Sequence, residues 1–241
     1  MQTQILLSLL AAGLFSAVHL AAPALYRLGH VPRAWWVSAA GGVAVAYVFL
    51  HLIPDLASHE EALMEAESRG ELVYVLALAG LAAFYGLERR VRRARPEGGA
   101  DPASRDAAFW IHIGSFSLYN MLIGYLLLHR EEDTLSSLLM YVGAIGLHFV
   151  TADIGLRHDH RRLYDGVGRW LLVGGVLAGA LLGLVAELPE QAIIALSSFL
   201  AGGIVLNTLK EELPENRESR FAPFALGAAG YGAILLLLSS G

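Results

Sequence analysis

Four ionisable side chains lie inside long apolar stretches of this sequence, where a charge is costly. They are three histidines and one aspartate: His19, His112, His148 and Asp153. A charged group at the centre of a bilayer costs about 2.5–3.5 kcal/mol on insertion scales, so each is a functional candidate. Imidazole and carboxylate groups bind zinc, iron and manganese, and they can also relay protons near neutral pH. The alternative is that they only make hydrogen bonds between helices.

One apolar stretch carries a stripe of polar residues. His112, Ser115, Tyr119 and, at its edge, Asn120 recur at three- and four-residue steps, so they share one face of a helix. The following stretch is joined to it by a short connection and should run antiparallel beside it. Pairing at equal depth then predicts that His148 lies near Phe116–Asn120, the second half of this stripe, and that Asp153 lies near His112.

His148, Asp153, Asn120 and His112 are therefore the candidate ligands of one metal site. His148 and Asp153 are about 140° apart around an ideal helix, so one cavity wall accommodates both more easily than one compact site. His51 and Asp55 are one helical turn apart and could form a separate entrance site or a cap at the membrane interface. The run His158–Asp159–His160 resembles a chelate but is more typical of a solvated loop.

The elements that must position these groups are eight apolar stretches. The chain has 241 residues, of which 56% are hydrophobic and only 16% charged, below the ~25% of a soluble domain. Each stretch is long enough for a membrane helix, and runs such as LLVGGVLAGALLGLVA lack the alternation of a barrel strand. The fold class is therefore all-α, a polytopic membrane protein. The expected spans are 4–27, 33–54, 71–88, 107–129, 134–156, 168–186, 191–210 and 221–240.

Charge predicts the orientation of these spans. With the N-terminus outside, fifteen of the 17 Lys and Arg residues fall on the inside connections, and only Arg69 and Arg130 fall outside. This positive-inside pattern predicts a multi-pass protein of the cytoplasmic (inner) membrane. The outside connection 55–71 is acidic, which is typical of a solvated loop and would also concentrate cations. His19, His112 and His148 would then lie roughly 8–12 Å inside the cytoplasmic boundary, at a common depth.

A single transmembrane domain, 1–241, is expected. Its connection 89–106 is basic and then rich in Pro and Gly, which predicts a cytoplasmic linker that contacts lipid. Aromatic residues do not interleave the basic run, so nucleic-acid binding is not expected. Overlapping GxxxG steps at Gly175, Gly179 and Gly183 predict close helix packing and allow a homodimer. The sequence lacks Cys, which excludes disulfides and thiolate ligands.

Two segments resemble each other. GGVAVAYVFLHLIPD (41–55) and GGIVLNTLKEELPE (202–215) each open with a Gly pair and end with an apolar residue, Pro and an acid, although their Gly-to-Pro spacings differ by one. They run in opposite directions across the membrane, which indicates an inverted repeat of spans 1–3 and 6–8 around spans 4 and 5, a 3+2+3 arrangement common in transporters.

These features resemble the ZIP (zinc/iron permease) metal transporters, in which eight spans, an outer N-terminus and a long connection after span 3 recur. FLHLIPD (49–55) and LKEELPE (209–215) are similar to that family's span-2 and span-7 endings. HFVTADIG (148–155) and SLYNMLIG (117–124) fall where the family carries its two-metal site. The resemblance implies that His148 and Asp153 are metal ligands.

The chain also departs from the family pattern. Phe149, Thr151 and Ala152 stand where the span-5 motif has an acid, a proline and a second His, and Phe116 stands where span 4 has a ligand His. The resemblance therefore implies a transporter with a reduced metal site.

The expected function is transport of a divalent cation, Zn²⁺ or Fe²⁺, as cargo, without a resident cofactor. A second hypothesis is a transporter fold that moves no metal and acts as a scaffold, a sensor or a carrier of another solute. A third, an intramembrane hydrolase using His112, Ser115, His148 and Asp153, is weaker because no supporting motif accompanies it. The absence of nucleotide-binding and nucleophile motifs leads us to expect that the chain is not an enzyme.

Overall fold

The structure is a computed structural model. It describes residues 2–25, 33–93, 102–130, 134–209 and 220–239. In these ranges the elements are all helices, and no strand occurs. They are α1 (Gln2–Leu25), α2 (Arg33–Tyr47), the π-helix η1 (Val48–Leu52), α3 (Ile53–Glu65), α4 (Leu72–Arg93), α5 (Pro102–Leu126), α6 (Leu135–Leu163), the π-helix η2 (Tyr164–Gly168), α7 (Arg169–Val185), α8 (Glu190–Asn207) and α9 (Phe221–Ser239).

Helices occupy all eight predicted ranges, and η1 joins α2 to α3 in one long rod. Within the described residues, six helical stretches are long and apolar enough to cross a membrane. They are Gln2–Ala24, Ser38–Glu65, Leu72–Arg90, Leu135–Arg157, His160–Val185 and Glu190–Asn207. α9 contributes a shorter apolar helix, Phe221–Leu237. α5 is not among the six, and its polar stripe and the SRD sequence of its first turns make it less apolar than its neighbours.

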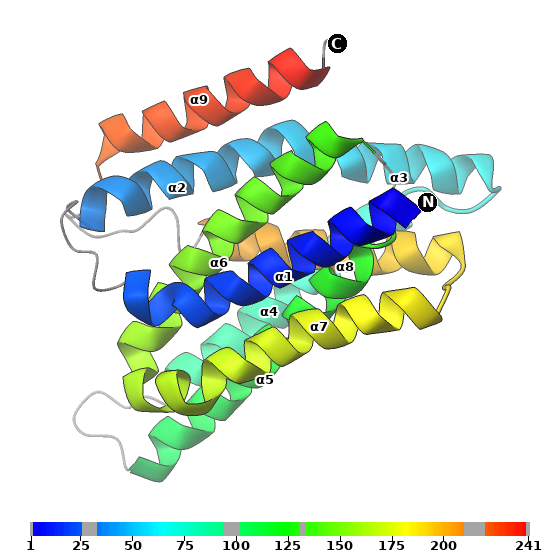
Figure 1. The fold of residues 1–241 in the computed structure, drawn as a ribbon. Coiled ribbons are helices and arrows are strands. Elements are labelled where there is room, and N and C mark those ends of the chain that lie inside the picture. The colour runs from blue at the N-terminus through cyan, green and yellow to red at the C-terminus, as the bar shows by residue number, and fades with distance from the viewer. Residues whose placement is uncertain (1, 26–32, 94–101, 131–133, 210–219, 240–241) are drawn as a thin grey trace.

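The helices form a bundle in which partners far apart in sequence lie side by side (Figure 1). The most extensive contacts join α5 to α7, α2 to α9 and α4 to α8. α1 packs on both α6 and α7, and α6 also packs on α2. The start of α1 and the end of α9 lie toward the side of the bundle that carries α3 (Figure 1).

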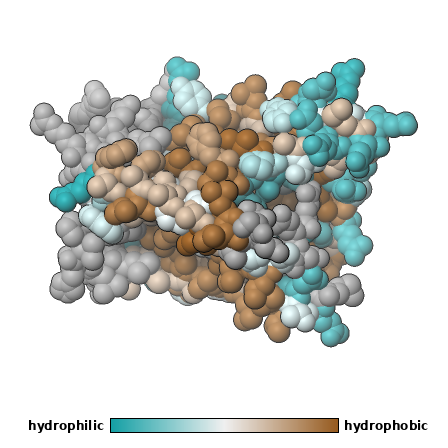
Figure 2. All heavy atoms as spheres, turned by 90° about the horizontal axis from the view of Figure 1, so that it is seen from above, coloured by the Kyte–Doolittle hydropathy of each residue, from teal (hydrophilic) through white to brown (hydrophobic). Residues whose placement is uncertain are grey.

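The outer surface agrees with a membrane environment. Figure 2 shows apolar side chains across the middle of the molecule and hydrophilic ones gathered at the end that carries α3. Large apolar side chains point outward along the rods, among them Leu6, Leu10 and Leu14 of α1 and Leu236 and Leu237 of α9. Such a continuous exposed apolar belt is what lipid covers in a membrane protein.

Glycines let three of the helix pairs approach closely, namely α2–α9, α4–α8 and α5–α7. In the α2–α9 pair, a Cβ at Gly42 would clash with the carbonyl oxygen of Phe224, and one at Gly227 would clash with that of Ala39. In each helix the contacted carbonyl lies three residues before that helix's own glycine. The two backbones therefore touch where only glycine leaves room.

The α4–α8 pair repeats this arrangement. A Cβ at Gly202 would clash with the carbonyl oxygen of Ala77, and one at Gly80 would clash with that of Phe199. Again each contacted carbonyl lies three residues before the glycine of the same helix.

The α5–α7 pair has this arrangement as well, because a Cβ at Gly124 would clash with the carbonyl oxygen of Val176 and one at Gly179 with that of Met121. The three interfaces are thus built to one pattern, and the close packing predicted at Gly179 is confirmed.

The π-helix η1 precedes Pro54, which lies in the first turn of α3. Proline lacks the N–H that an α-helix requires in its interior, and the wider π-turn lets the rod continue past it. The backbone N–H of Ile53 donates to the carbonyl of Val48, five residues earlier. The rod carries His51 and Asp55 on either side of this junction.

The predicted linker 89–106 is helical at both of its ends. α4 continues to Arg93 and α5 begins at Pro102. Residues 94–101 lie outside the described residues, and so does most of the motif predicted at 209–215. Thr134 caps α6, its hydroxyl oxygen accepting a hydrogen bond from the backbone N–H of Ser137 at 3.2 Å.

Candidate functional site

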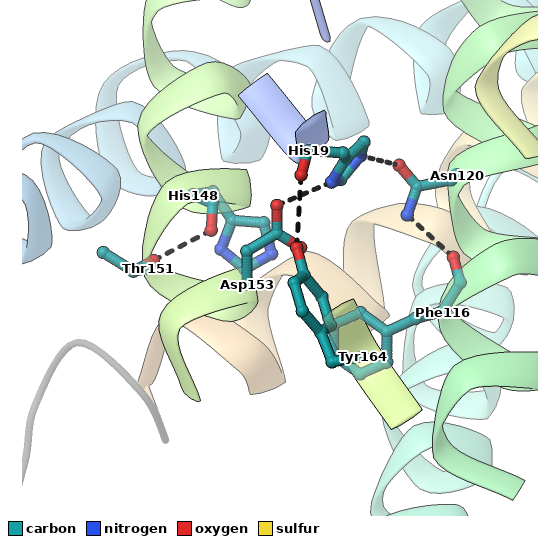
Figure 3. Close-up of polar contacts among 7 residues, drawn as sticks. All are labelled: His19, Phe116, Asn120, His148, Thr151, Asp153 and Tyr164. Atoms are coloured by element: carbon teal, nitrogen blue, oxygen red, sulfur yellow. Dashed lines mark hydrogen bonds and ion pairs between the residues drawn. The ribbon is translucent and has the colours of Figure 1, made fainter. Parts of the chain in front are cut away.

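Three buried side chains from three helices form a hydrogen-bonded set, which we call the polar centre: His19 of α1, Asn120 of α5 and Asp153 of α6 (Figure 3). The Nδ1 atom of His19 lies 2.8 Å from Oδ2 of Asp153, and its Nε2 atom lies 2.9 Å from Oδ1 of Asn120. All three residues are about 1% exposed. The pair of His19 and Asp153 is therefore shielded from solvent. At such a position the loss of either partner would leave the other buried without compensation.

The Asn120 amide determines where one proton lies. Its Nδ2 donates to the backbone carbonyl of Phe116, one turn earlier, at 2.8 Å. Its Oδ1 atom can then only accept, so Nε2 of His19 carries a hydrogen and donates it. The remaining proton of the set lies in the bond between Nδ1 of His19 and Asp153. Whichever atom holds that proton, this pair carries no net charge.

A tyrosine at the turn after α6 positions the first helix. The Tyr164 hydroxyl of η2 donates to the backbone carbonyl of His19 at 3.4 Å (Figure 3). Tyr164 is fully buried. This contact holds α1 at the depth at which its imidazole meets Asp153.

His148 lies close to the polar centre but outside its hydrogen bonds. It is 3% exposed, and neither ring nitrogen has a hydrogen-bond partner among the described residues. Its ring centroid lies 6.2 Å from that of Tyr119 and 6.3 Å from that of Phe149. The predicted proximity of His148 to the second half of the α5 stripe is confirmed by the Tyr119 contact. A buried imidazole whose nitrogens lack partners is the group best able to accept a ligand.

His112, the fourth predicted ligand, lies further along α5. Its ring packs 4.9 Å from the Phe116 ring, whose own centroid lies 6.2 Å from that of Tyr119. No described contact joins His112 to Asp153, and the described residues contain no group of three or more His, Asp or Glu side chains arranged to hold a metal ion. The four predicted ligands therefore do not form one compact site. Asn120 and Asp153 belong to the polar centre, whereas His148 and His112 lie outside its hydrogen bonds.

A cavity of about 160 Å³ opens between η1, α3, α6, α8 and the end of α5. We call it the α3-end cavity. Its wall includes the predicted entrance pair, whose atoms His51 Nε2 and Asp55 Oδ2 are 3.6 Å apart. The same wall carries His59, His129 and Arg130. His51 and Asp55 therefore point to one side, as their spacing predicted, and face a space that can hold a small solute.

Two side-chain contacts were not predicted. His19 was a candidate because of its predicted depth, but the sequence could not identify Asp153 as its partner. Arg157, assigned to a cytoplasmic connection, is 3% exposed and donates to both oxygens of Asp165 at 2.7 and 2.9 Å. This fork fixes the turn from α6 into η2. The side chains of His158 and Asp159, part of the predicted chelate, lie outside the described residues.

Comparison with known proteins does not assign the chain to a family. No protein-family model matches the chain, and no curated protein matches it in sequence.

Proposed function

We propose that this chain is an eight-span transporter of the cytoplasmic membrane, built as an inverted repeat in which α1 to α4 correspond to α7 to α9. α5 and α6 lie between the two blocks. The pattern of helix contacts supports this arrangement. Exchanging the two blocks, and α5 with α6, turns the α2–α9 pair into the α8–α4 pair. The same exchange turns the α1–α6 pair into the α7–α5 pair, and all four pairs are in contact.

Matched details along α2 and α8 give further support. The two segments align without a gap when Gly42, the second glycine of its pair, is matched with Gly202, the first of its pair. The same number of residues then separates Gly42 from Gly202, the first π-helical residue Val48 from Thr208, and Pro54 from Pro214. Both helices use the glycine for close backbone contact, and both change to π geometry six residues later. A chance similarity between two Gly-rich helices would not explain why their packing glycines and their π-turns fall at matching positions. The coincidence therefore favours a repeat.

The cargo we propose is a divalent metal cation such as Zn²⁺ or Fe²⁺, as in the ZIP family that the sequence resembles. The observation that carries this proposal is the His148 imidazole, buried next to the polar centre with both nitrogens without a partner in the described residues. Neutral imidazole is an ordinary ligand of these metals, and Asp153 of the polar centre supplies a carboxyl group on the same helix as His148. The His51–Asp55 pair would receive the ion in the α3-end cavity.

Uptake by purified protein in liposomes tests this function. Zn²⁺ or Fe²⁺ should accumulate down an imposed gradient, and His148→Ala should lose most of that uptake. Gly114→Ala, which alters a helix position with no atom within 4 Å, is the matched control and should transport normally. Absence of uptake by folded wild-type protein would contradict the proposal.

A second candidate function is favoured by one observation. The His19 imidazole already faces the buried carboxylate of Asp153 at 2.8 Å, in the region where the resemblance places a metal. The fold would then serve as a scaffold, a sensor or a carrier of another solute. Elemental analysis separates the two functions: stoichiometric metal that is lost in His148→Ala supports metal transport, whereas metal-free protein with an intact fold supports the second candidate.

A further inference from the structure

We propose that Phe15 and Phe149 form an apolar gate between the α3-end cavity and the polar centre, and that a solute passes only when this pair separates. The role of the gate rests on the proposed transport function. The barrier itself depends only on how the two rings pack. It can therefore be tested by the access of a water-soluble reagent, without measuring transport.

The two phenylalanines form the layer next to the ion pair. Phe15 lies one helical turn before His19 on α1, and Phe149 lies one turn before Asp153 on α6. Their ring centroids are 5.1 Å apart with the rings steeply inclined at 74°. The same two helices therefore meet through two successive contacts, an aromatic pair and then the pair of His19 and Asp153.

The aromatic pair is linked to the cavity on one side. The Phe15 ring centroid lies 6.3 Å from that of Tyr141, and the Tyr141 centroid lies 6.4 Å from that of Tyr47. Tyr141 and Tyr47 both line the α3-end cavity. Rings in mutual contact thus extend from the cavity wall to Phe15.

The pair is linked to the polar centre on its other side. The Phe149 ring centroid lies 4.6 Å from that of His19 and 6.3 Å from that of His148. Phe15 is fully buried and Phe149 is 2% exposed. The two rings therefore fill the space between the cavity and the imidazoles.

An apolar layer of this kind stops a hydrated ion. An ion would have to leave its water to pass between two phenyl rings, which offer no hydrogen bond in return. Apolar constrictions of channels close a path by excluding water in the same way. Removing one ring should open the layer to water, while replacing it by another apolar side chain of similar size should keep it closed.

The absence of native cysteine makes a direct test possible. A single thiol is placed either in the cavity wall, as Ser197→Cys, or in the polar centre, as Asn120→Cys. A membrane-impermeant cationic methanethiosulfonate reagent is then applied to sealed vesicles from the side on which Ser197→Cys reacts. With both phenylalanines present, Asn120→Cys should react slower than Ser197→Cys by an order of magnitude or more. Adding Phe149→Ala should raise its reaction rate by a similar factor.

Three further variants make the result specific. Phe149→Leu should leave the Asn120→Cys thiol protected, because it keeps an apolar group in place. Phe109→Ala removes a fully buried ring from a separate core cluster and should also leave it protected. Phe15→Ala provides a second opening if Phe149→Ala does not yield folded protein.

Two outcomes would overturn the gate. One is fast labelling of Asn120→Cys while both rings are present, and the other is unchanged slow labelling in both Phe149→Ala and Phe15→Ala. Neither depends on transport, so a protein that moves no metal can still confirm the gate. Conversely, metal uptake by a protein in which these rings do not control access would refute the gate and retain the proposed function.

Discussion

The Nδ1 atom of His19 lies 2.8 Å from Oδ2 of Asp153, although the two residues are 134 positions apart in the sequence. This contact joins the first helix to the sixth and gives the buried carboxylate a protein partner. Asn120 accepts from the opposite side of the same imidazole. The carboxylate predicted as a metal ligand thus also links α1 to α6, so the proposed function would place a metal on a residue that the packing of the bundle already uses.

Removing one member of this pair should destabilise the protein strongly. His19→Ala leaves the carboxylate of Asp153 buried without its partner, which typically costs about 3–5 kcal/mol. His148→Ala should cost clearly less, because no described group depends on its ring nitrogens. The free energy of unfolding in detergent, followed by tryptophan fluorescence during denaturant titration, measures both. Equal losses in the two variants would contradict the assignment.

The double variant His19→Leu/Asp153→Leu refines this prediction. Replacing a buried ion pair by apolar side chains of similar volume is often neutral or stabilising. The double variant should therefore be more stable than His19→Ala, even though it lacks both polar groups. If the double variant is instead less stable than His19→Ala, the pair contributes more to the stability of the bundle than the neutralisation of two buried polar groups.

The α3-end cavity and the polar centre should affect transport differently. If Asp55 belongs to an entrance, Asp55→Asn should raise the external ion concentration needed for half-maximal uptake several-fold and leave the maximal rate nearly unchanged. Asp153→Asn should instead reduce the maximal rate, because it alters the buried end of the path. Initial rates of uptake over a range of ion concentrations distinguish the two effects. A loss of maximal rate in Asp55→Asn would assign that residue to the transport step itself.

The helices could be predicted from the sequence, because a chain in an apolar environment must pair its backbone N–H and C=O groups within each segment. Among the described residues each of the eight predicted ranges contains a helix, and the boundaries differ mainly where α3, α4, α5 and α6 extend past the predicted limits. Hydropathy could not show those extensions, since a helix continues into water when its own contacts allow it. The segment 55–65 is one such case, an acidic helix rather than an irregular connection.

The partners within the site were harder to predict. Depth placed His19 and His148 in one layer, yet depth does not tell which way each side chain points around its helix. That direction depends on how α1 packs against α6 and α7, which are more than 75 residues away in the sequence. The tie between His19 and Asp153 therefore required the packed bundle, whereas the His51–Asp55 pair on one rod followed from spacing alone.

The glycine contacts predict a matched pair of packing defects. Gly42→Ala and Gly202→Ala should each lower stability by about 1–3 kcal/mol or more, because the added methyl meets a backbone carbonyl that cannot turn away. Gly114→Ala has no neighbour within 4 Å and should be neutral or stabilising by up to about 1 kcal/mol, since alanine favours the helix. Thermal unfolding of the three variants in one detergent provides the comparison. A harmless Gly202→Ala beside a harmful Gly42→Ala would break the equivalence of the two interfaces.

Labelling of two single cysteines decides whether α4 and α5 both cross the membrane. Ser68→Cys lies in the connection between α3 and α4, and Ser136→Cys lies at the start of α6. With eight spans the chain crosses twice between these positions, so an impermeant thiol reagent should reach both from the same side. If α5 does not cross, as its lower hydropathy would allow, the two thiols should react from opposite sides. Because α5 carries Asn120 and packs on α7, which is itself apolar enough to span, we expect both to react from one side.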